Sequence, residues 1–359
     1  MSTIFEKIID YDNMYKAYEE TQSGESKYKV AAMKFTENEV YNLMTLIDEL
    51  NNGTYKMGDY TMFIVNEPKK RIIHAPKYRD KIVQVAINQV LKHVFNPKFI
   101  YSSYSCIDKK GTHACVNRIG YYLRKAKWLY GDDAYIVKLD IKKFFYSIDR
   151  SILKRLFAKK LRCARTLNLI YEIIDSADKI SEKGLPLGNT ISQLSANIYM
   201  NVFDQYCKRD LGINFYVRYA DDIVVILENK EKAKAFLEHA RVFVKEKLNI
   251  ELNKKKSKIF PLSQGVNAIG FKNYPTHKLL RNRSKRNIKR KARKLERLLI
   301  QGKVTCEKVE QIFNSWKGHA DSGCSHNFIK KLVNKHNYLI INNKGVFKVN
   351  KKALKEEIY

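Results

Sequence analysis

The stretch "YVRYADDIVVI", residues 216–226, places Asp221 and Asp222 side by side inside a strongly apolar run. The residues on either side, 215–219 and 223–227, are typical of two β-strands, and Ala220 begins the tight turn between them. An ionised carboxylate in an apolar setting is costly unless another group compensates its charge. The pair therefore indicates either a hairpin turn exposed to solvent or a site that holds a cation.

A third carboxylate ends another predicted strand. In "AYIVKLDIKKFF", residues 134–145, the side chains alternate up to Asp140, which favours a strand that stops there. Neighbouring strands lie ~4.8 Å apart, so the three carboxylates converge if the two segments share a sheet. Such a cluster repels itself unless cations compensate it. Two magnesium ions ~4 Å apart would do so and would clamp the reacting oxygens of a phosphoryl transfer.

Composition indicates a folded protein with a polyanionic partner. The 359 residues contain 68 Lys and Arg against 37 Asp and Glu, a formal net charge of +31, which favours nucleic acid over a mere solubility surplus. None of the six cysteines forms a CxxC pair, which indicates reduced thiols. We find no signal peptide and no apolar run of the ~18 residues that a membrane span needs, so we expect a cytoplasmic protein without a membrane partner.

The order of patterns predicts a mixed α/β fold with a central antiparallel sheet and a basic helical region after it. Gly53 is expected to end a helix, and residues 67–71 form a basic turn between two short strands. A helix over 151–161 is expected to be capped by Asp149 or Ser151. The expected domains are a helical extension (1–57), fingers (58–135, with part of 150–195), a palm (136–275) and a helical thumb with a tail (276–359).

Several motifs together resemble reverse transcriptases, over residues 60–332. "PKKRIIHAP", "LDIKKFF", "GLPLGNTISQLSANIYMN", "YADD", "LNKKKSKI" and "IGF" follow one another as the motifs of that family do. The resemblance implies a right-hand polymerase with fingers, palm and thumb. "YSCIDKKGTHACVNRI", "GNTISQ", "HKLLRNRSKRNIKR" and "SWKGHA" are most similar to the branch of the diversity-generating retroelements. Ala220 departs from that branch, in which Met is more usual.

The resemblance implies a two-metal polymerase centre. Asp140 and Asp221 would ligate two Mg²⁺ ions, or Mn²⁺ as a substitute, with Asp222 as a weaker third ligand and the main chain of Ile141 beside them. The primer 3′ hydroxyl would be the nucleophile. Lys256 matches a lysine that protonates the departing pyrophosphate. Because lysines crowd this segment, Lys258 is the alternative.

The expected nucleotide site lies on the fingers and palm. The resemblance implies that the aromatic ring of Phe145 excludes a ribose 2′ hydroxyl, although one of the adjacent apolar residues Phe144 and Phe145 must face the core. Leu187 stands where many relatives carry Gln, and the resemblance implies low fidelity opposite template adenines. Gln193, like Asn197 on the same helix, would contact the template, stabilise the loop or cap the helix. The whole set for the deoxynucleoside triphosphate is Lys70, Arg71, Arg79, Phe144, Phe145, Leu187 and Gln193.

Residues 281–297 contain ten Lys or Arg in seventeen, too much charge for a core helix. We expect this segment to track the primer–template backbone, with binding that weakens steeply in salt. The residues concerned are Arg281, Arg283, Lys285, Arg286, Lys289, Arg290 and Arg293. A loose grouping of His319, Cys324 and His326 allows a zinc site as a minor alternative.

These patterns are compatible with three functions. The first is an RNA-directed DNA polymerase that makes error-bearing cDNA from the template RNA of a bacterial or phage diversity-generating retroelement, with a small basic accessory protein as its partner. The second is a reverse transcriptase of another lineage, of the phage-defence, retron or intron kind. The short segment after Leu332 leaves little room for a maturase domain, which speaks against the intron kind. The third is a non-catalytic RNA-binding scaffold.

Overall fold

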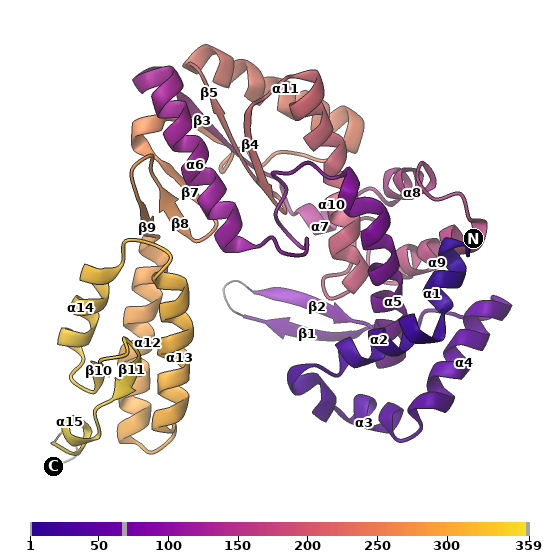
Figure 1. Ribbon diagram of the computed structural model, residues 1–359, viewed down its shortest axis with the longest axis horizontal. Coiled ribbons are helices and arrows are strands. Elements are labelled where there is room, and N and C mark those ends of the chain that lie inside the picture. Colours follow the sequence, from indigo (N-terminus) through magenta and orange to yellow (C-terminus); the bar gives the residue numbers. More distant parts are fainter. Residues whose placement is uncertain (1, 67–69, 357–359) are drawn as a thin grey trace. The chain divides into compact units, whose positions relative to one another are not determined.

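The computed structural model describes residues 2–66 and 70–356 (Figure 1). The chain divides into two compact units. The first comprises residues 1–111, 139–223 and 234–258, and the second comprises residues 112–138, 224–233 and 259–359. None of the described helices is long and apolar enough to span a membrane.

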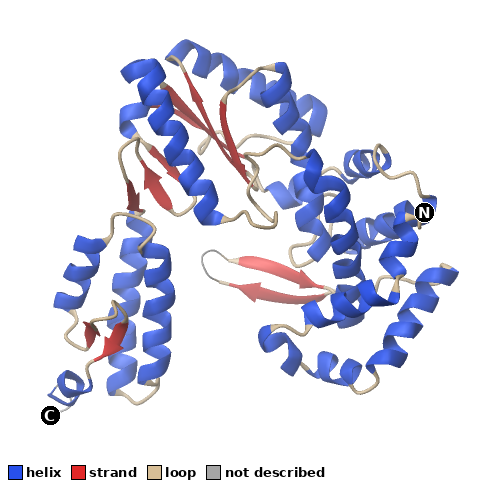
Figure 2. Ribbon diagram, in the orientation of Figure 1, coloured by secondary structure: helices blue, strands red, loops and turns tan. Residues whose placement is uncertain are grey.

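The first unit is built on two buried helices, α5 (Tyr78–Phe95) and α10 (Thr190–Gln205), which pack against each other. Around them lie α1 (Ile4–Ile9), α2 (Tyr11–Thr21), α3 (Val30–Thr36), α4 (Glu39–Asn52), α7 (Phe144–Ser147), α8 (Arg150–Ala158) and α9 (Ala164–Asp175). The hairpin of β1 (Thr61–Val65) and β2 (Arg71–Ala75) belongs to the same unit, and its strands are antiparallel. Figure 2 shows this hairpin as a separate two-stranded ribbon.

Two predicted helix boundaries are confirmed in this unit. α4 ends at Gly53, whose φ of 72° is the left-handed conformation that glycine adopts without steric cost. α8 begins after Asp149, whose side chain accepts hydrogen bonds from the backbone N–H groups of Ser151 and Ile152. In the basic turn predicted at 67–71, residues 67–69 lie outside the described part of the chain.

The central sheet contains four strands in the order β4-β5-β3-β6. They are β3 (Tyr135–Asp140), β4 (Phe215–Tyr219), β5 (Asp222–Leu227) and β6 (Lys258–Pro261), and α11 (Lys230–Leu248) lies between β5 and β6 in the sequence. The middle residues of β4 and β5 are buried, as their apolar composition predicts. Because β5 begins at Asp222 next to β3, which ends at Asp140, the sheet order satisfies the condition for the carboxylates to converge.

The second unit contains α6 (Thr112–Tyr130), a three-stranded sheet and the C-terminal helices. The strands are β7 (Val266–Ala268), β8 (Phe271–Asn273) and β9 (Lys278–Leu280), all antiparallel. The helices are α12 (Asn282–Ile300), α13 (Cys306–Ala320), α14 (His326–Lys335) and α15 (Lys351–Glu356), and a hairpin of β10 (Leu339–Ile341) and β11 (Phe347–Val349) precedes α15. One apolar core joins Val116 of α6 to Phe271, Phe313 and Phe347. The predicted mixed α/β class is confirmed, whereas the division into fingers, palm and thumb stays a prediction.

Candidate active site

The turn between β4 and β5 presents the two adjacent aspartates. Ala220 adopts a φ of 52°, a left-handed conformation that is uncommon for a residue with a side chain. Asp221 follows it in the turn, and Asp222 is the first residue of β5. Both are partly buried, so the turn is not simply open to solvent.

Asp140 lies at the end of β3 with Lys256 beside it. The Lys256 Nζ lies 2.9 Å and 3.0 Å from the two carboxylate oxygens of Asp140. Its neighbour Ser257 shares hydrogen bonds with the main chain of Asp140, and the N–H of Asn253 donates to the Asp140 carbonyl at 2.7 Å. The segment 253–257 thus holds Lys256, rather than Lys258, at the carboxylate. Between the two predicted lysines, the geometry favours the first.

Ile141, predicted to offer its main chain, follows Asp140 and forms an isolated antiparallel bridge with Leu252. The two hydrogen bonds of this pairing are made by the residues on either side, Asp140 with Asn253 and Lys142 with the carbonyl of residue 251. This is the wide type of antiparallel pair, in which the bridged residues exchange no bonds of their own.

The electrostatics show that the three carboxylates interact. Burial raises the pKa of Asp221, and the negative charges of Asp222 and Asp140 raise it further. A backbone hydrogen bond and the Lys256 ammonium act in the opposite direction but do not cancel these effects. The structure therefore brings together the four side chains that the sequence singles out, and it leaves Asp221 with an excess of negative charge around it.

A buried arginine fixes this turn, and sequence reasoning did not identify its role. Arg218 is fully buried and donates to both carboxylate oxygens of Asp204, at 2.7–2.9 Å. Its Nη1 also donates to the carbonyl of Ala220 at 3.2 Å and to the side chain of Asn197 at 3.0 Å. Asn197 in turn donates to the carbonyl of Ser105. The guanidinium thus connects α10 to the backbone next to the turn that presents Asp221.

Asn197 was expected to contact the template, stabilise the loop or cap the helix. It lies well inside α10 and is 2% exposed, so it is neither a cap nor a template contact. Asp204, Asn197 and Arg218 are all charged or polar side chains within apolar elements. Such side chains must be paired when buried, and this is the signal that could have found them.

The loop before α10 packs directly on the segment that follows Asp140. The N–H of Leu185 donates to the carbonyl of Phe145 at 2.7 Å. Gly184 has a φ of 87°, and a Cβ there would lie 2.5 Å from the Cα of Tyr146 and 2.6 Å from the Phe145 carbonyl. Only glycine permits this close approach. Phe145 is half-buried, while Phe144 is 3% exposed and belongs to the core, so one ring of the pair faces inward as predicted.

The same loop also contacts β2 of the hairpin. The N–H of His74 donates to the carbonyl of Leu187 at 2.7 Å, and a Cβ at Gly188 would lie 2.6 Å from the His74 carbonyl. The Leu187 side chain is partly exposed. The loop 184–188 therefore joins the hairpin to the residues beside Asp140, so its conformation sets where Leu187 and Phe145 lie.

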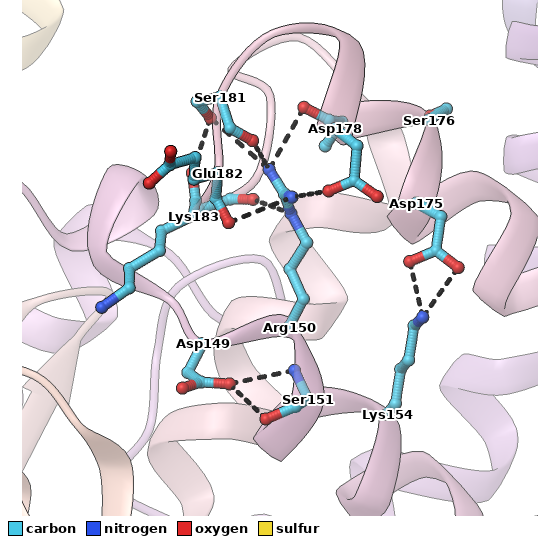
Figure 3. Close-up of polar contacts among 12 residues, drawn as sticks. Asp149, Arg150, Ser151, Lys154, Asp175, Ser176, Asp178, Ser181, Glu182 and Lys183 are labelled. Carbon is cyan, nitrogen blue, oxygen red and sulfur yellow. Dashed lines mark hydrogen bonds and ion pairs between the residues drawn. The ribbon is translucent and has the colours of Figure 1, made fainter.

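Figure 3 shows how this loop is held from its other end. The Arg150 side chain, 8% exposed, reaches from the start of α8 into the segment before Gly184. It donates to the Gly184 carbonyl at 2.8 Å and the Ala177 carbonyl at 3.1 Å, forms an ion pair with Asp178, and also donates to the Ser181 carbonyl. Most of its acceptors are backbone carbonyls, which leave no pattern in the sequence.

Comparison with known proteins agrees with this geometry. The family described as "Reverse transcriptase (RNA-dependent DNA polymerase)" matches residues 64–305. The chain belongs to the reverse transcriptase family. It is an RNA-directed DNA polymerase, and enzymes of this family use divalent metal ions. The third predicted function, a non-catalytic RNA-binding scaffold, is therefore set aside.

Two curated relatives are similar to this reverse transcriptase. Protein YkfC of Escherichia coli is 24% identical over 283 residues, which cover 68% of this chain and 72% of YkfC. The group II intron-encoded protein LtrA of Lactococcus lactis is 23% identical over 298 residues, which cover 63% of this chain and 48% of LtrA. The chain thus spans about half the length of LtrA. Among solved structures, Candida albicans telomerase with a fragment of telomeric RNA matches 71% of this chain and 55% of its own, with a TM-score of 0.48 and 9% identity.

The donor set of the reverse transcriptase fits a hard divalent cation in its chemistry. Within residues 2–66 and 70–356, no three His, Cys, Asp or Glu side chains are arranged as a ready-made metal cage, which also removes the zinc alternative at His319, Cys324 and His326. Magnesium, however, usually takes one or two protein carboxylates and completes its shell with water and substrate phosphates. The raised pKa of Asp221 marks where a cation would relieve repulsion.

The predicted triphosphate residues separate into two groups. Lys70 and Arg71 are exposed on the β1–β2 hairpin, where they are open to a phosphate. Arg79 instead forms an ion pair with Glu49 and lies over the ring of Tyr55, so its guanidinium ties α5 to α4. We therefore correct the prediction for Arg79. Phe144 is corrected likewise, because its burial in the core keeps it from the nucleotide.

Gln193 is exposed on α10 and stays a prediction as a template or nucleotide contact.

The predicted nucleic-acid helix is α12. Its buried face contains Ile288, Ala292 and Leu295, which pack into the core of the second unit. Five of the predicted basic residues are exposed on its other faces, namely Arg283, Arg286, Lys289, Arg290 and Arg293, whereas Lys285 and the N-cap residue Arg281 are partly buried. Lys285 and Lys289 lie 5.7 Å and 5.5 Å from the ring centre of Phe328 on α14. This aromatic partner was not predicted, because nothing in its local sequence links it to α12.

Proposed function

We propose that this reverse transcriptase copies a template RNA into error-bearing cDNA within a diversity-generating retroelement. The observation that supports the chemistry best is the coupled group of Asp140, Asp221, Asp222 and Lys256. The motifs of the retroelement branch and the leucine at position 187 support the biological role. A small basic accessory protein, the template RNA, a primer strand and deoxynucleoside triphosphates are the proposed partners.

The residues of this chain would act as follows. Asp140 and Asp221, with Asp222 beside them, would hold two divalent ions, Mg²⁺ or Mn²⁺, which lower the pKa of the primer hydroxyl and neutralise phosphate charge. Lys256 lies next to Asp140 and would give a proton to the departing pyrophosphate.

The other residues would bind and select the nucleotide. Lys70 and Arg71 would bind the triphosphate, Lys as a point charge and Arg through paired hydrogen bonds. Phe145 would exclude a 2′ hydroxyl. Leu187 cannot form the hydrogen bonds of a glutamine near the new base pair, which reduces discrimination between nucleotides.

The test is primer extension by the full chain on a defined RNA template with Mg²⁺ or Mn²⁺, followed by sequencing of the cDNA. We expect errors concentrated opposite template adenines, and we expect Leu187→Gln to lower their frequency. Activity that survives the double substitution Asp221→Ala and Asp222→Ala would contradict the proposed centre.

A second candidate role is that of an intron-type or phage-defence reverse transcriptase. The similarity to LtrA, a group II intron-encoded protein, favours it. The same sequencing separates the two roles, since uniform accuracy at all four template bases would favour this second role.

A further inference from the structure

The helix α6 has an amphipathic arrangement with an unusual outer face. Its buried residues, Cys115, Val116, Ile119, Leu123 and Ala126, lie on one side of the helix. At 3.6 residues per turn, Arg118, Tyr121, Lys125 and Trp128 fall within an arc of about 80° on another side. We call these four residues the α6 face. The buried side of α6 already supplies its apolar contacts with the rest of the unit. Folding therefore does not require aromatic residues on the α6 face.

The α6 face exposes large aromatic surface. Trp128 is 80% exposed and Tyr121 is 40% exposed. Cations lie over the tyrosine: Arg118 is 5.5 Å and Lys125 is 5.7 Å from the ring centre of Tyr121. Aromatic rings that alternate with cations at a protein surface are the arrangement on which single-stranded nucleic acids stack their bases.

The charge of α6 points to the same class of partner. The helix sequence contains Arg118, Arg124, Lys125 and Lys127 but no Asp or Glu. Lys127 is neutralised by an ion pair with Asp132, and it points away from the α6 face at the helical spacing. Arg124 and Lys125 are both exposed, beside and on the α6 face, and Arg118 adds a third positive charge to it, so the face is complementary to a chain of phosphates.

A groove extends this surface toward the three-stranded sheet. It has a volume of about 360 Å³, and its lining includes Asn117 and Arg124 of α6 together with Tyr274, His277 and Lys278. The rings of Tyr274 and His277 stack at 4.7 Å with an angle of 18° between them. The groove thus repeats the combination of cations and aromatic rings next to the α6 face.

We propose that the α6 face binds single-stranded RNA, a stretch of the template RNA outside the duplex that is being copied. Tyr121 and Trp128 are separated by seven residues, or about 10 Å along the helix, so each can stack a different base. Lys125 lies between them and Arg118 lies one turn before Tyr121, where both cations would contact the phosphates. The inference requires only an RNA substrate, so it stands whether or not the retroelement role is correct.

The first experiment reads Trp128 directly. The chain has two tryptophans, so Trp316→Phe leaves Trp128 as the only indole. Titration of this full-length variant with a single-stranded RNA of mixed sequence should quench the fluorescence, because a stacked base quenches an indole. An RNA–DNA duplex of the same length should quench it less. Absence of quenching by the single strand, or stronger quenching by the duplex, would overturn the proposal.

The second experiment measures affinity by fluorescence anisotropy with the same labelled RNA. Replacement of both Tyr121 and Trp128 by Ala should weaken binding about tenfold or more, since each stacked base contributes substantially. Tyr41→Ala on α4, which removes a ring that is 73% exposed, is the matched control and should leave affinity unchanged. Equal losses in both variants, or none in the double variant, would refute the assignment.

Two further readouts separate RNA binding at the α6 face from damage to the catalytic centre and from binding of an acidic protein. Primer extension on a short blunt-ended primer–template should be unchanged in the double variant, which shows that the catalytic centre is intact. A polyglutamate peptide should fail to reverse the RNA-induced quenching at matched charge. If the peptide reverses it as well as unlabelled RNA does, the α6 face is a site for an acidic protein and the proposal is wrong.

Discussion

Removal of Arg218 should destabilise the first unit more than removal of any surface charge. The Arg218 and Asp204 side chains are both fully buried, and three hydrogen bonds of 2.7–2.9 Å join them. Arg218→Met leaves the Asp204 carboxylate in the core with the hydroxyl of Tyr216, at 2.6 Å, as a neutral hydrogen-bond donor. A buried charge that loses its counter-charge costs about 3–5 kcal/mol. That is a large share of the about 5–15 kcal/mol by which a domain is stable.

The assay is chemical denaturation followed by circular dichroism, with Lys56→Met as the matched control. Lys56 forms an ion pair with Glu172 at 3.4 Å, but the Lys56 side chain is 77% exposed, so we expect a cost below about 1 kcal/mol. Asp204→Asn should cost nearly as much as Arg218→Met. The double substitution should cost clearly less than the sum of the two, because it leaves neither charge alone.

Arg218→Lys separates catalysis from stability. Lysine keeps a positive charge near Asp204, but it lacks the planar fork that also reaches the Ala220 carbonyl. We therefore expect primer extension to fall more steeply than the fraction of folded protein. Costs below about 1 kcal/mol for Arg218→Met, strict additivity in the double variant, or full activity of Arg218→Lys would refute this role of the buried arginine.

Three further predictions concern the residues around the turn. Asp221 has a raised pKa in the folded state. The free energy of unfolding should therefore decline as the pH rises from 3.8, the ordinary pKa of the group, through the raised pKa of Asp221. Asp221→Asn should remove that decline and raise stability at neutral pH by on the order of 1 kcal/mol, measured by denaturation without divalent ions, while primer extension is lost. Phe145→Ala should admit ribonucleotides in single-nucleotide extension assays, and an unchanged preference for deoxynucleotides would remove it from the gate. Gly184→Ala should cost at least about 2 kcal/mol more than Gly53→Ala in the same denaturation assay, because both have positive φ but only the first lacks space for a Cβ.

Local sequence patterns predicted those parts of the site whose secondary structure is determined by one segment of the chain. The strand that ends at Asp140 and the apolar halves around Asp221 follow from alternation alone, and their pairing follows from the sheet order. Arg218 lies within the stretch 216–226, yet its partner Asp204 lies on a separate helix. A charge inside an apolar strand indicates that a buried partner exists, but the sequence does not say which acid supplies it.

Other contacts leave no signal in the sequence at all. Arg150 binds mainly backbone carbonyls of the loop before Gly184, and any residue type offers a carbonyl. For Arg79 the sequence suggested a contact that the structure does not favour. Its position near the hairpin predicted a phosphate contact, but its guanidinium forms an ion pair with Glu49. Basic side chains are versatile, and only the tertiary structure decides which of them remain open to a ligand.

The distribution of stabilising and destabilising groups explains how this turn can persist. Asp221 is surrounded by like charges, and Ala220 is held in a conformation that alanine disfavours, so the turn alone is unfavourable. The buried ion pair of Arg218 and Asp204 behind the turn is costly to break. Arg218 connects this pair to the turn by its hydrogen bond to the Ala220 carbonyl. Substitution of Asp221 should therefore stabilise the fold and abolish activity, whereas substitutions at Arg218 should reduce both. A reverse transcriptase variant selected for thermal stability alone would be expected to lose Asp221 before its buried arginine.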